Sequence, residues 1–210
     1  MSKKTFRKLF LIFILLCVVA LLFLHSDWTK RQYDKGLSAF YVYRGDRAYK
    51  KRDLQGAINY YSLALDLYPE HYEARYNLGN IYVVYEDYND AVDSYKIALE
   101  DKPDFNVARM NLGIVTAEKL GNFDEAIADY QQIINNQPRL FSIPFLFSNR
   151  KSAKLNRGIA YYNMGVAYRQ KAIYEDSNDS LKRSQNLQNA VDSYMSASKI
   201  LKKDFDTFYN

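Results

Sequence analysis

The sequence predicts an all-α protein: an α-solenoid of about four helix pairs that follow an N-terminal transmembrane helix. Three observations predict this fold class. An uninterrupted run of 16 apolar residues occupies positions 9–24. Beyond it, one pattern of alanine, tyrosine and proline recurs with prolines 34 and 35 residues apart, which is typical of stacked repeats. The 210 residues include only 8 Gly and 4 Pro, too few turn-forming residues for a β-sandwich.

The N-terminal run predicts a transmembrane signal anchor over residues 9–27, with membrane contact through residues 9–24. A 16-residue helix spans about 24 Å of a hydrocarbon core of about 30 Å, so Lys8 and Trp28 would complete the span from the two interfaces. The basic N-terminus, residues 1–8, has four basic residues and no acidic one. The positive-inside rule therefore predicts that it is cytoplasmic and that everything after the anchor is extracytoplasmic, which means periplasmic in a bacterium.

Two other interpretations of this segment compete with an uncleaved anchor. A cleaved signal peptide needs a small-x-small site after the apolar run, and the only candidate, around Ala20, lies inside the run. Lipidation of Cys17 would need a small residue where Leu16 stands. Cleavage stays open as the alternative, and Cys17 is expected to be an apolar filler of the helix.

Composition excludes several classes of function. The net charge is +5, but four of the 29 basic residues precede the apolar run, so the rest has 25 basic against 24 acidic residues. A nearly neutral body does not favour nucleic-acid binding. One Cys and 2 His leave little material for a metal site, and no cofactor-binding or catalytic motif is present. We therefore expect no metal, no cofactor and no enzymatic activity.

The body of the chain repeats one unit four times. Each copy has a glycine in its first half, an Ala-x3-Tyr motif in its second half and, in the first three copies, a proline further on. The pattern predicts two antiparallel helices per unit, with small residues at close crossings and the tyrosine in the seam between units. The motif residues are Gly45, Gly79, Gly113 and Gly165; Ala57, Ala91, Ala126 and Ala190; Tyr61, Tyr95, Tyr130 and Tyr194; Pro69, Pro103 and Pro138.

The turns inside these units contain helix-start residues. Asp53, Asp87 and Asn122 fall between the two helices of a pair, where Asp and Asn favour the first position of a helix. His71 follows a proline at the start of the next unit, and we expect it to be exposed rather than to act as a base.

This arrangement resembles the tetratricopeptide repeat, whose signature joins Trp-x2-Leu-Gly-x2-Tyr to a later Ala-x3-Phe and a proline. Tyrosine replaces the phenylalanine in all four copies, and the resemblance covers roughly residues 36–203. It implies a repeat domain over residues 28–210, with an apolar linker at 140–150 and a polar insertion near 175–185 inside the last pair, whose helices are expected to be long. The repeats are expected near residues 38–71, 72–105, 106–139 and 158–203.

Asparagine occupies one repeat position three times. Asn77, Asn111 and Asn163 each precede the Leu-Gly or Met-Gly pair, so stacking should align them on the concave face formed by the first helices. An amide has one acceptor and two donors and can bind both backbone groups of an extended peptide. This register is similar to the asparagine ladder of peptide-binding repeat domains. The alternative, that these residues bridge neighbouring helices, stays open.

The surroundings of this ladder are neutral and aromatic. We expect the same face to present Tyr43, Tyr76, Asn80, Met110 and Tyr162 as peptide- or partner-binding residues. The sequence therefore predicts a membrane-anchored protein-interaction scaffold that binds a peptide segment or partner helix in its concave groove, in the assembly or maintenance of an envelope complex. The alternative is a self-associating spacer or coat, a homo-oligomer on the membrane.

Overall fold

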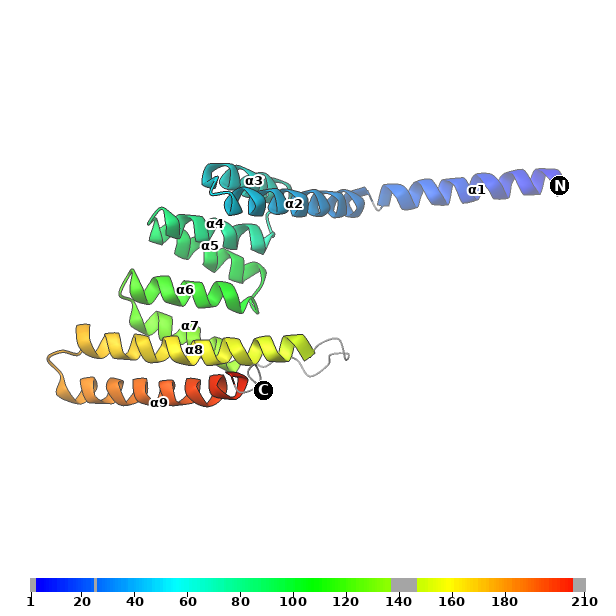
Figure 1. The fold of residues 1–210 in the computed structure, drawn as a ribbon. Coiled ribbons are helices and arrows are strands. Elements are labelled where there is room, and N and C mark those ends of the chain that lie inside the picture. Colours follow the sequence, from blue (N-terminus) through cyan, green and yellow to red (C-terminus); the bar gives the residue numbers. More distant parts are fainter. Residues whose placement is uncertain (1–2, 25, 137–146, 206–210) are drawn as a thin grey trace. The chain divides into compact units, whose positions relative to one another are not determined.

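The structure is a computed structural model that describes residues 3–24, 26–136 and 147–205. In these residues every regular element is an α-helix, and nine helices follow one another along the chain (Figure 1). The chain divides into two compact units, residues 1–71 and 72–210. The all-α prediction of four helix pairs behind one apolar helix is thereby confirmed.

The first unit contains α1 (Lys3–Leu24), α2 (Ser26–Lys50) and α3 (Leu54–Leu67). Helices α2 and α3 pack as a pair through small residues, and Ser38 Oγ donates a hydrogen bond to the Ala64 carbonyl at 2.8 Å. Helix α2 begins well before position 38, where the first repeat was expected, and its first two turns are exposed. The prediction that His71 is exposed is wrong: its ring packs edge-on against Tyr68 and the residue is buried.

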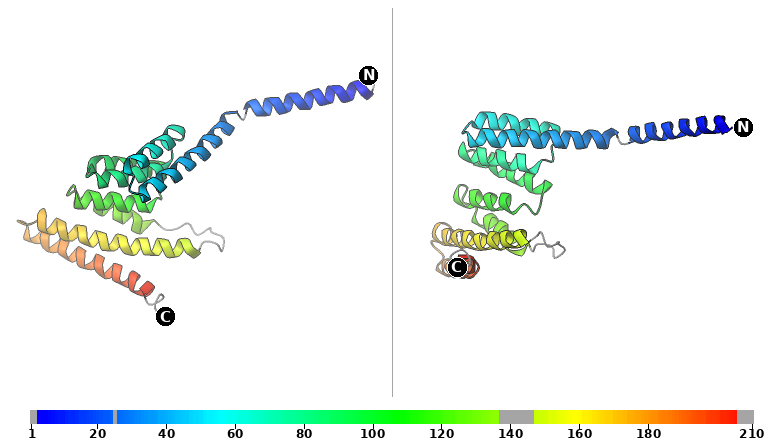
Figure 2. Two further views of the ribbon diagram at one scale, coloured as in Figure 1. Left: turned by 45° about the horizontal axis from the view of Figure 1, so that its top comes forward. Right: turned by 45° about the vertical axis from the view of Figure 1, so that its right-hand side comes forward.

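The second unit contains three helix pairs. They are α4 (Tyr72–Val84) with α5 (Tyr88–Asp101), α6 (Asn106–Glu118) with α7 (Phe123–Asn135), and α8 (Phe147–Tyr174) with α9 (Ser180–Phe205). Each of these helices packs against the next one along the chain. Helices α8 and α9 have 28 and 26 residues and form a long antiparallel pair, which confirms the prediction that the last pair is long (Figure 2).

Helix α8 begins inside the stretch that was expected to be an apolar linker. Its first residue is Phe147, so positions 147–150 are helical. The remainder of the expected linker, 140–146, lies outside the described residues. The start of α8 also precedes position 158, where the fourth repeat was expected.

A sharp backbone turn joins the two helices of each of the first three pairs. The N-cap residues of the second helices are Asp53, Asp87 and Asn122, where the sequence predicted helix starts. Only at Asp53 is a side-chain cap seen, where the carboxylate accepts the Gly56 N–H at 2.9 Å. The residue before each start has left-handed backbone, with φ of 66° at Arg52, 64° at Glu86 and 71° at Gly121. This conformation reverses the chain in one residue and so keeps the two helices in contact.

The repeated glycine and tyrosine form one contact in each pair. A Cβ atom added to Gly79 would lie 2.6 Å from Cε1 of Tyr95, and the same contact recurs between Gly45 and Tyr61. The third and fourth pairs repeat it with Tyr130 on Gly113 and Tyr194 on Gly165. The ring therefore lies against the glycine of its own repeat. Tyr61, Tyr95 and Tyr130 are almost completely buried, and among the described residues they are the largest of the fully buried side chains.

Candidate functional site

Helices α4, α6 and α8 hold the three asparagines of the expected ladder. Asn77, Asn111 and Asn163 are half-buried, one on the first helix of each pair in the second unit. We call the side of these helices that carries the asparagines the A-helix face. Helix α8 also contacts α6, so the asparagine-bearing helices of the last two pairs are neighbours.

Asn111 is the centre of a hydrogen-bond network between repeats. Its Nδ2 donates to Tyr76 Oη at 3.2 Å and to Asn80 Oδ1 at 3.0 Å, so it joins α6 to α4. Asn80 Oδ1 also accepts the Tyr95 hydroxyl at 2.8 Å. Both N–H groups of the Asn111 amide are thus used inside the protein, which leaves its oxygen as the group that could meet a ligand. Bridging of neighbouring helices, the alternative role, is what this residue does here.

Tyr76 is fixed by the same network and by aromatic packing. Its ring centroid lies 5.8 Å from that of Tyr95 and 5.1 Å from that of Phe105. An aromatic side chain held on two sides and hydrogen-bonded at its tip presents a fixed surface. Tyr76 and Asn80 therefore both meet the Asn111 amide, and both act first as structural partners.

Around Asn163 the surface is more open. Tyr162 is 53% exposed, and its ring centroid lies 5.7 Å from that of Tyr194. Asn163 Nδ2 donates to Met110 Sδ at 3.3 Å, and sulfur is a weak acceptor. Met110, which we expected to meet a partner, is only 9% exposed because it packs into the core between α6, α7 and α8.

Tyr43 belongs to the other unit. It is 56% exposed on α2, and the Arg47 guanidinium lies 6.0 Å from its ring centroid. It is therefore an accessible aromatic side chain of the first unit.

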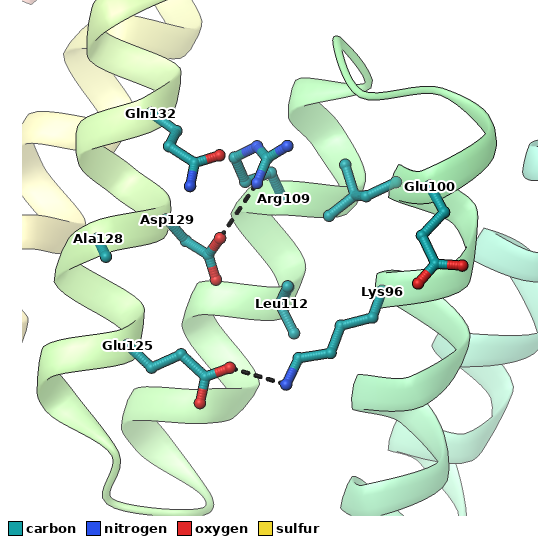
Figure 3. A pocket seen from close by; sticks show the side chains of 9 residues that line it. Lys96, Glu100, Arg109, Leu112, Glu125, Ala128, Asp129 and Gln132 are labelled. Atoms are coloured by element: carbon teal, nitrogen blue, oxygen red, sulfur yellow. Dashed lines mark hydrogen bonds and ion pairs between the residues drawn. The ribbon is translucent and has the colours of Figure 1, made fainter.

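A pocket of about 430 Å³ lies between α5, α6 and α7 (Figure 3), and none of the three asparagines lines it. Arg109 and Leu112, three residues apart on α6, line it, whereas Asn111 projects from a different side of the same helix to reach α4. Lys96 Nζ lies 2.8 Å from Glu125 Oε1 across the pocket. The remaining lining residues are Leu99, Glu100, Ala128, Asp129 and Gln132.

The carboxylate of Asp129 is the most buried charge in this pocket. Arg109 donates to its Oδ1 at 3.3 Å and also to the Pro103 carbonyl at 3.0 Å. The side chain of Asp129 is 9% exposed, and burial raises the pKa of its carboxyl to about 6, although Arg109 acts in the opposite direction. The nearby Glu125 carboxylate raises it further.

Sequence reasoning missed Asp129. It stands directly before the repeated tyrosine, where the other copies have Tyr60, Ser94 and Ser193. An acidic residue at that position in one copy alone was the available signal. Among residues 3–24, 26–136 and 147–205, no three His, Cys, Asp or Glu side chains come together as a metal site would require.

One helix in the described part of the chain is long and apolar enough to cross a membrane. It is α1, whose stretch Lys3–Leu22 has a mean hydropathy of 2.4 and no buried residues. A signal sequence near an N-terminus meets the same test. The helix extends further toward the N-terminus than the apolar run, and its 22 residues give a length of about 33 Å.

Comparison with known proteins agrees with the helix pairs. Two tetratricopeptide repeat family models match residues 48–110 and 85–140. No match was found among curated protein sequences.

Solved structures give similarities of fold. MamA is 20% identical, with a TM-score of 0.49 over 84% of this chain and 85% of that one. PilW, described as a type IV pilus biogenesis factor, is 17% identical, with a TM-score of 0.48 over 78% of each chain. YrrB, described as having an unusual peptide-binding site, is 22% identical, with a TM-score of 0.43 over 78% of this chain and 90% of that one.

Proposed function

We propose that this chain, which belongs to the tetratricopeptide repeat family over residues 48–140, is a membrane-anchored scaffold that binds a protein partner through its A-helix face. Proteins of this family generally act as interaction scaffolds rather than enzymes. The observation that supports the A-helix face is the recurrence of asparagine at one position of α4, α6 and α8 beside exposed Tyr162. The partner is an extended segment or an amphipathic helix with apolar anchors, because the side chains named on this face are neutral.

The structure suggests different roles for two of the three asparagines. Asn111 holds Tyr76 and Asn80 in place through its two N–H groups. Within the described part of the chain, the Asn163 amide is held by a hydrogen bond to a sulfur atom alone, so exchanging that hydrogen bond for one to a peptide carbonyl costs little. We therefore expect Asn163 to contact the partner and Asn111 to position the surface.

Site-specific photocrosslinking tests this function. A photoreactive phenylalanine analogue at Tyr162 should give an adduct with a membrane or envelope protein in cells, and the same analogue at exposed Ile97 on α5 should not. The Asn163→Ala substitution should abolish the Tyr162 adduct, while Asn89→Ala at an exposed position of α5 should leave it unchanged. Equal crosslinking at Tyr162 and Ile97, or an adduct that survives Asn163→Ala, would count against the A-helix face.

We also propose the orientation of the chain. Helix α1 acts as an uncleaved anchor with Lys3, Lys4, Arg7 and Lys8 in the cytoplasm and the repeats outside it, in the periplasm if the source is bacterial. A reporter that works only outside the cytoplasm, fused after Asn210, should be active. Activity of a cytoplasm-dependent reporter at the same place would reverse the orientation.

A self-associating spacer is the second candidate. Three exposed apolar residues, Leu187, Val191 and Met195, lie four apart on α9 and form a stripe along one side of this helix. The occupant in this case is a second copy of the chain. Light scattering of the full chain in micelles should then show a mass that rises with concentration, and Val191→Glu should abolish the rise. A strict monomer would refute this candidate.

A further inference from the structure

Helix α8 has an exposed apolar stripe along much of its length. Leu155, Tyr162 and Ile173 are 44%, 53% and 47% exposed, and Val166 between them is half-buried. At about 3.6 residues per turn, these four positions fall within about 40° of one another around the helix axis. The stripe from position 155 to position 173 is about 27 Å long, because each residue adds about 1.5 Å.

The spacing of the stripe is the spacing of paired helices. Its successive members are 7, 4 and 7 residues apart, which are intervals between a and d positions of a heptad. The two positions that complete this series are Ile159, which is half-buried and packs against the core, and exposed Arg169. A narrow a/d stripe is the seam along which one helix packs on another, whereas an extended segment presents side chains at every second residue. The stripe therefore suits a helix.

Polar amides run along one side of this stripe. Asn156, Asn163 and Gln170 are seven residues apart, are half-buried and lie about 80° around the helix from the apolar residues. On the other side α9 runs alongside α8 (Figure 2), and the Tyr194 ring lies against Gly165. The stripe is thus bordered by α9 on one side and by groups that both donate and accept hydrogen bonds on the other.

The charge of α8 indicates the chemistry of the helix that would pack on it. Its 28 residues include six basic residues and no acidic one, whereas α5 has four acidic residues and one basic one. Arg169 is exposed and occupies a d position of the seam itself. We propose that the stripe on α8 docks an amphipathic helix of a partner protein, with apolar residues at a and d spacing and acidic residues beside them.

This inference rests on the proposed function, because Tyr162 and Asn163 belong to both, and it adds the form and the charge of the partner. The stripe also extends beyond the three asparagines. Leu155 lies two turns before Asn163, and Ile173 lies almost three turns after it. These two residues therefore test the docked helix separately from the asparagine position.

Titration of the full chain in phosphatidylcholine nanodiscs, read by fluorescence anisotropy, tests the proposal. The probe is a labelled peptide of three Glu-Leu-Ala-Ala-Leu-Glu-Ala heptads, which places leucine at a and d and glutamate beside them. One control peptide has lysine in place of every glutamate, and the other has the same composition with the leucines spread around the helix. We expect saturable binding of the acidic peptide and at least tenfold weaker binding of each control.

Variants of the chain locate the binding. Leu155→Glu and Ile173→Glu should each weaken binding of the acidic peptide at least tenfold. Leu63→Glu on α3 is the matched control, because Leu63 is also 44% exposed, and it should leave binding unchanged. Arg169→Glu should reduce the preference for the acidic peptide over the lysine peptide. Equal binding of the two peptides, wild-type affinity in both Leu155→Glu and Ile173→Glu, or the absence of saturable binding would overturn the proposal.

Two further outcomes separate the proposal from its neighbours. If replacing a third of the lipid by phosphatidylglycerol abolishes peptide binding, the stripe meets an anionic bilayer and the helix proposal is wrong. A Tyr162 adduct in cells without binding of the acidic peptide leaves the A-helix face standing and refutes the acidic helix as its partner. Binding of the acidic peptide without that adduct supports the seam on α8 and refutes the proposed function in cells.

Discussion

Replacing Gly79 by alanine tests the packing of the repeats most directly. The added Cβ would lie 2.6 Å from Cε1 and 2.8 Å from Cδ1 of Tyr95. Carbon atoms in contact prefer about 3.5–4.0 Å, so the overlap approaches about 1 Å. The Tyr95 ring cannot easily move away, because it is 1% exposed and its hydroxyl is held by Asn80 at 2.8 Å.

Two opposing effects set the size of the change. Alanine is favoured over glycine inside a helix by about 1 kcal/mol. Overpacking costs about 1–3 kcal/mol, and displacing the Tyr95 hydroxyl would forfeit a hydrogen bond worth about 1 kcal/mol. We therefore expect Gly79→Ala to destabilise α4 and α5 by about 1–3 kcal/mol. Gly36→Ala at an exposed position of α2 is the matched control, because an added Cβ there would meet nothing within 4 Å outside its own stretch of helix backbone; it should stabilise α2 by up to about 1 kcal/mol.

Hydrogen exchange read by mass spectrometry can follow the two helices separately in the full chain in micelles. The Tyr95→Leu substitution removes the ring, so Gly79→Ala should cost much less in that background than in the wild type. If Gly79→Ala slows exchange in α4 and α5, as Gly36→Ala is expected to do in α2, the glycine-to-tyrosine contact is not what requires a glycine here.

Three further predictions concern single side chains. Burial raises the pKa of Asp129 to about 6, above its usual unfolded value of about 3.9, so protonation favours the folded state and stability should rise as pH falls from 7 toward 4. Asp129→Asn should raise stability at pH 7 by up to about 3 kcal/mol and flatten this pH dependence in urea unfolding; an unchanged pH profile would contradict the raised pKa. Tyr95→Phe should lower the free energy of unfolding by about 1 kcal/mol in the same assay, because it removes the hydrogen bond of the hydroxyl. Tyr130→Phe should lower it less, because the residue at the acceptor position of the third repeat is an isoleucine; equal losses from the two substitutions would contradict this argument. Asp53→Ala should cost about 1 kcal/mol through its lost helix cap, and Asp87→Ala less, because no capping bond is seen there; the reverse order in hydrogen exchange would reject the capping argument.

The helices were predictable because the chain repeats a local code. Proline at fixed spacing determines where helices stop, and glycine and alanine determine where two helices approach each other closely. These effects act over a few residues. The early starts of α2 and α8 were not predictable in the same way. Gly36 and the polar residues around it favour no particular boundary, and the first turns of α2 make few contacts that a repeat pattern would reveal.

The site was less predictable than the fold. Sequence spacing placed Asn111 and Asn163 correctly on successive first helices, but it could not show that the Asn111 amide is used by Tyr76 and Asn80 or that Met110 is covered. Those outcomes depend on which side chains of adjacent repeats reach each other. The Asp129–Arg109 pair, 20 residues apart in sequence, was missed for the same reason.

The buried tyrosines impose an upper pH on the array. Burial raises the pKa of Tyr130 and of Tyr194, so their phenols stay neutral while the helices are packed. In an unfolded chain the same phenols ionise near pH 10. High pH therefore shifts the folding equilibrium toward the unfolded chain. The same tyrosine side chains that stabilise the packed helices at neutral pH destabilise them in strong base.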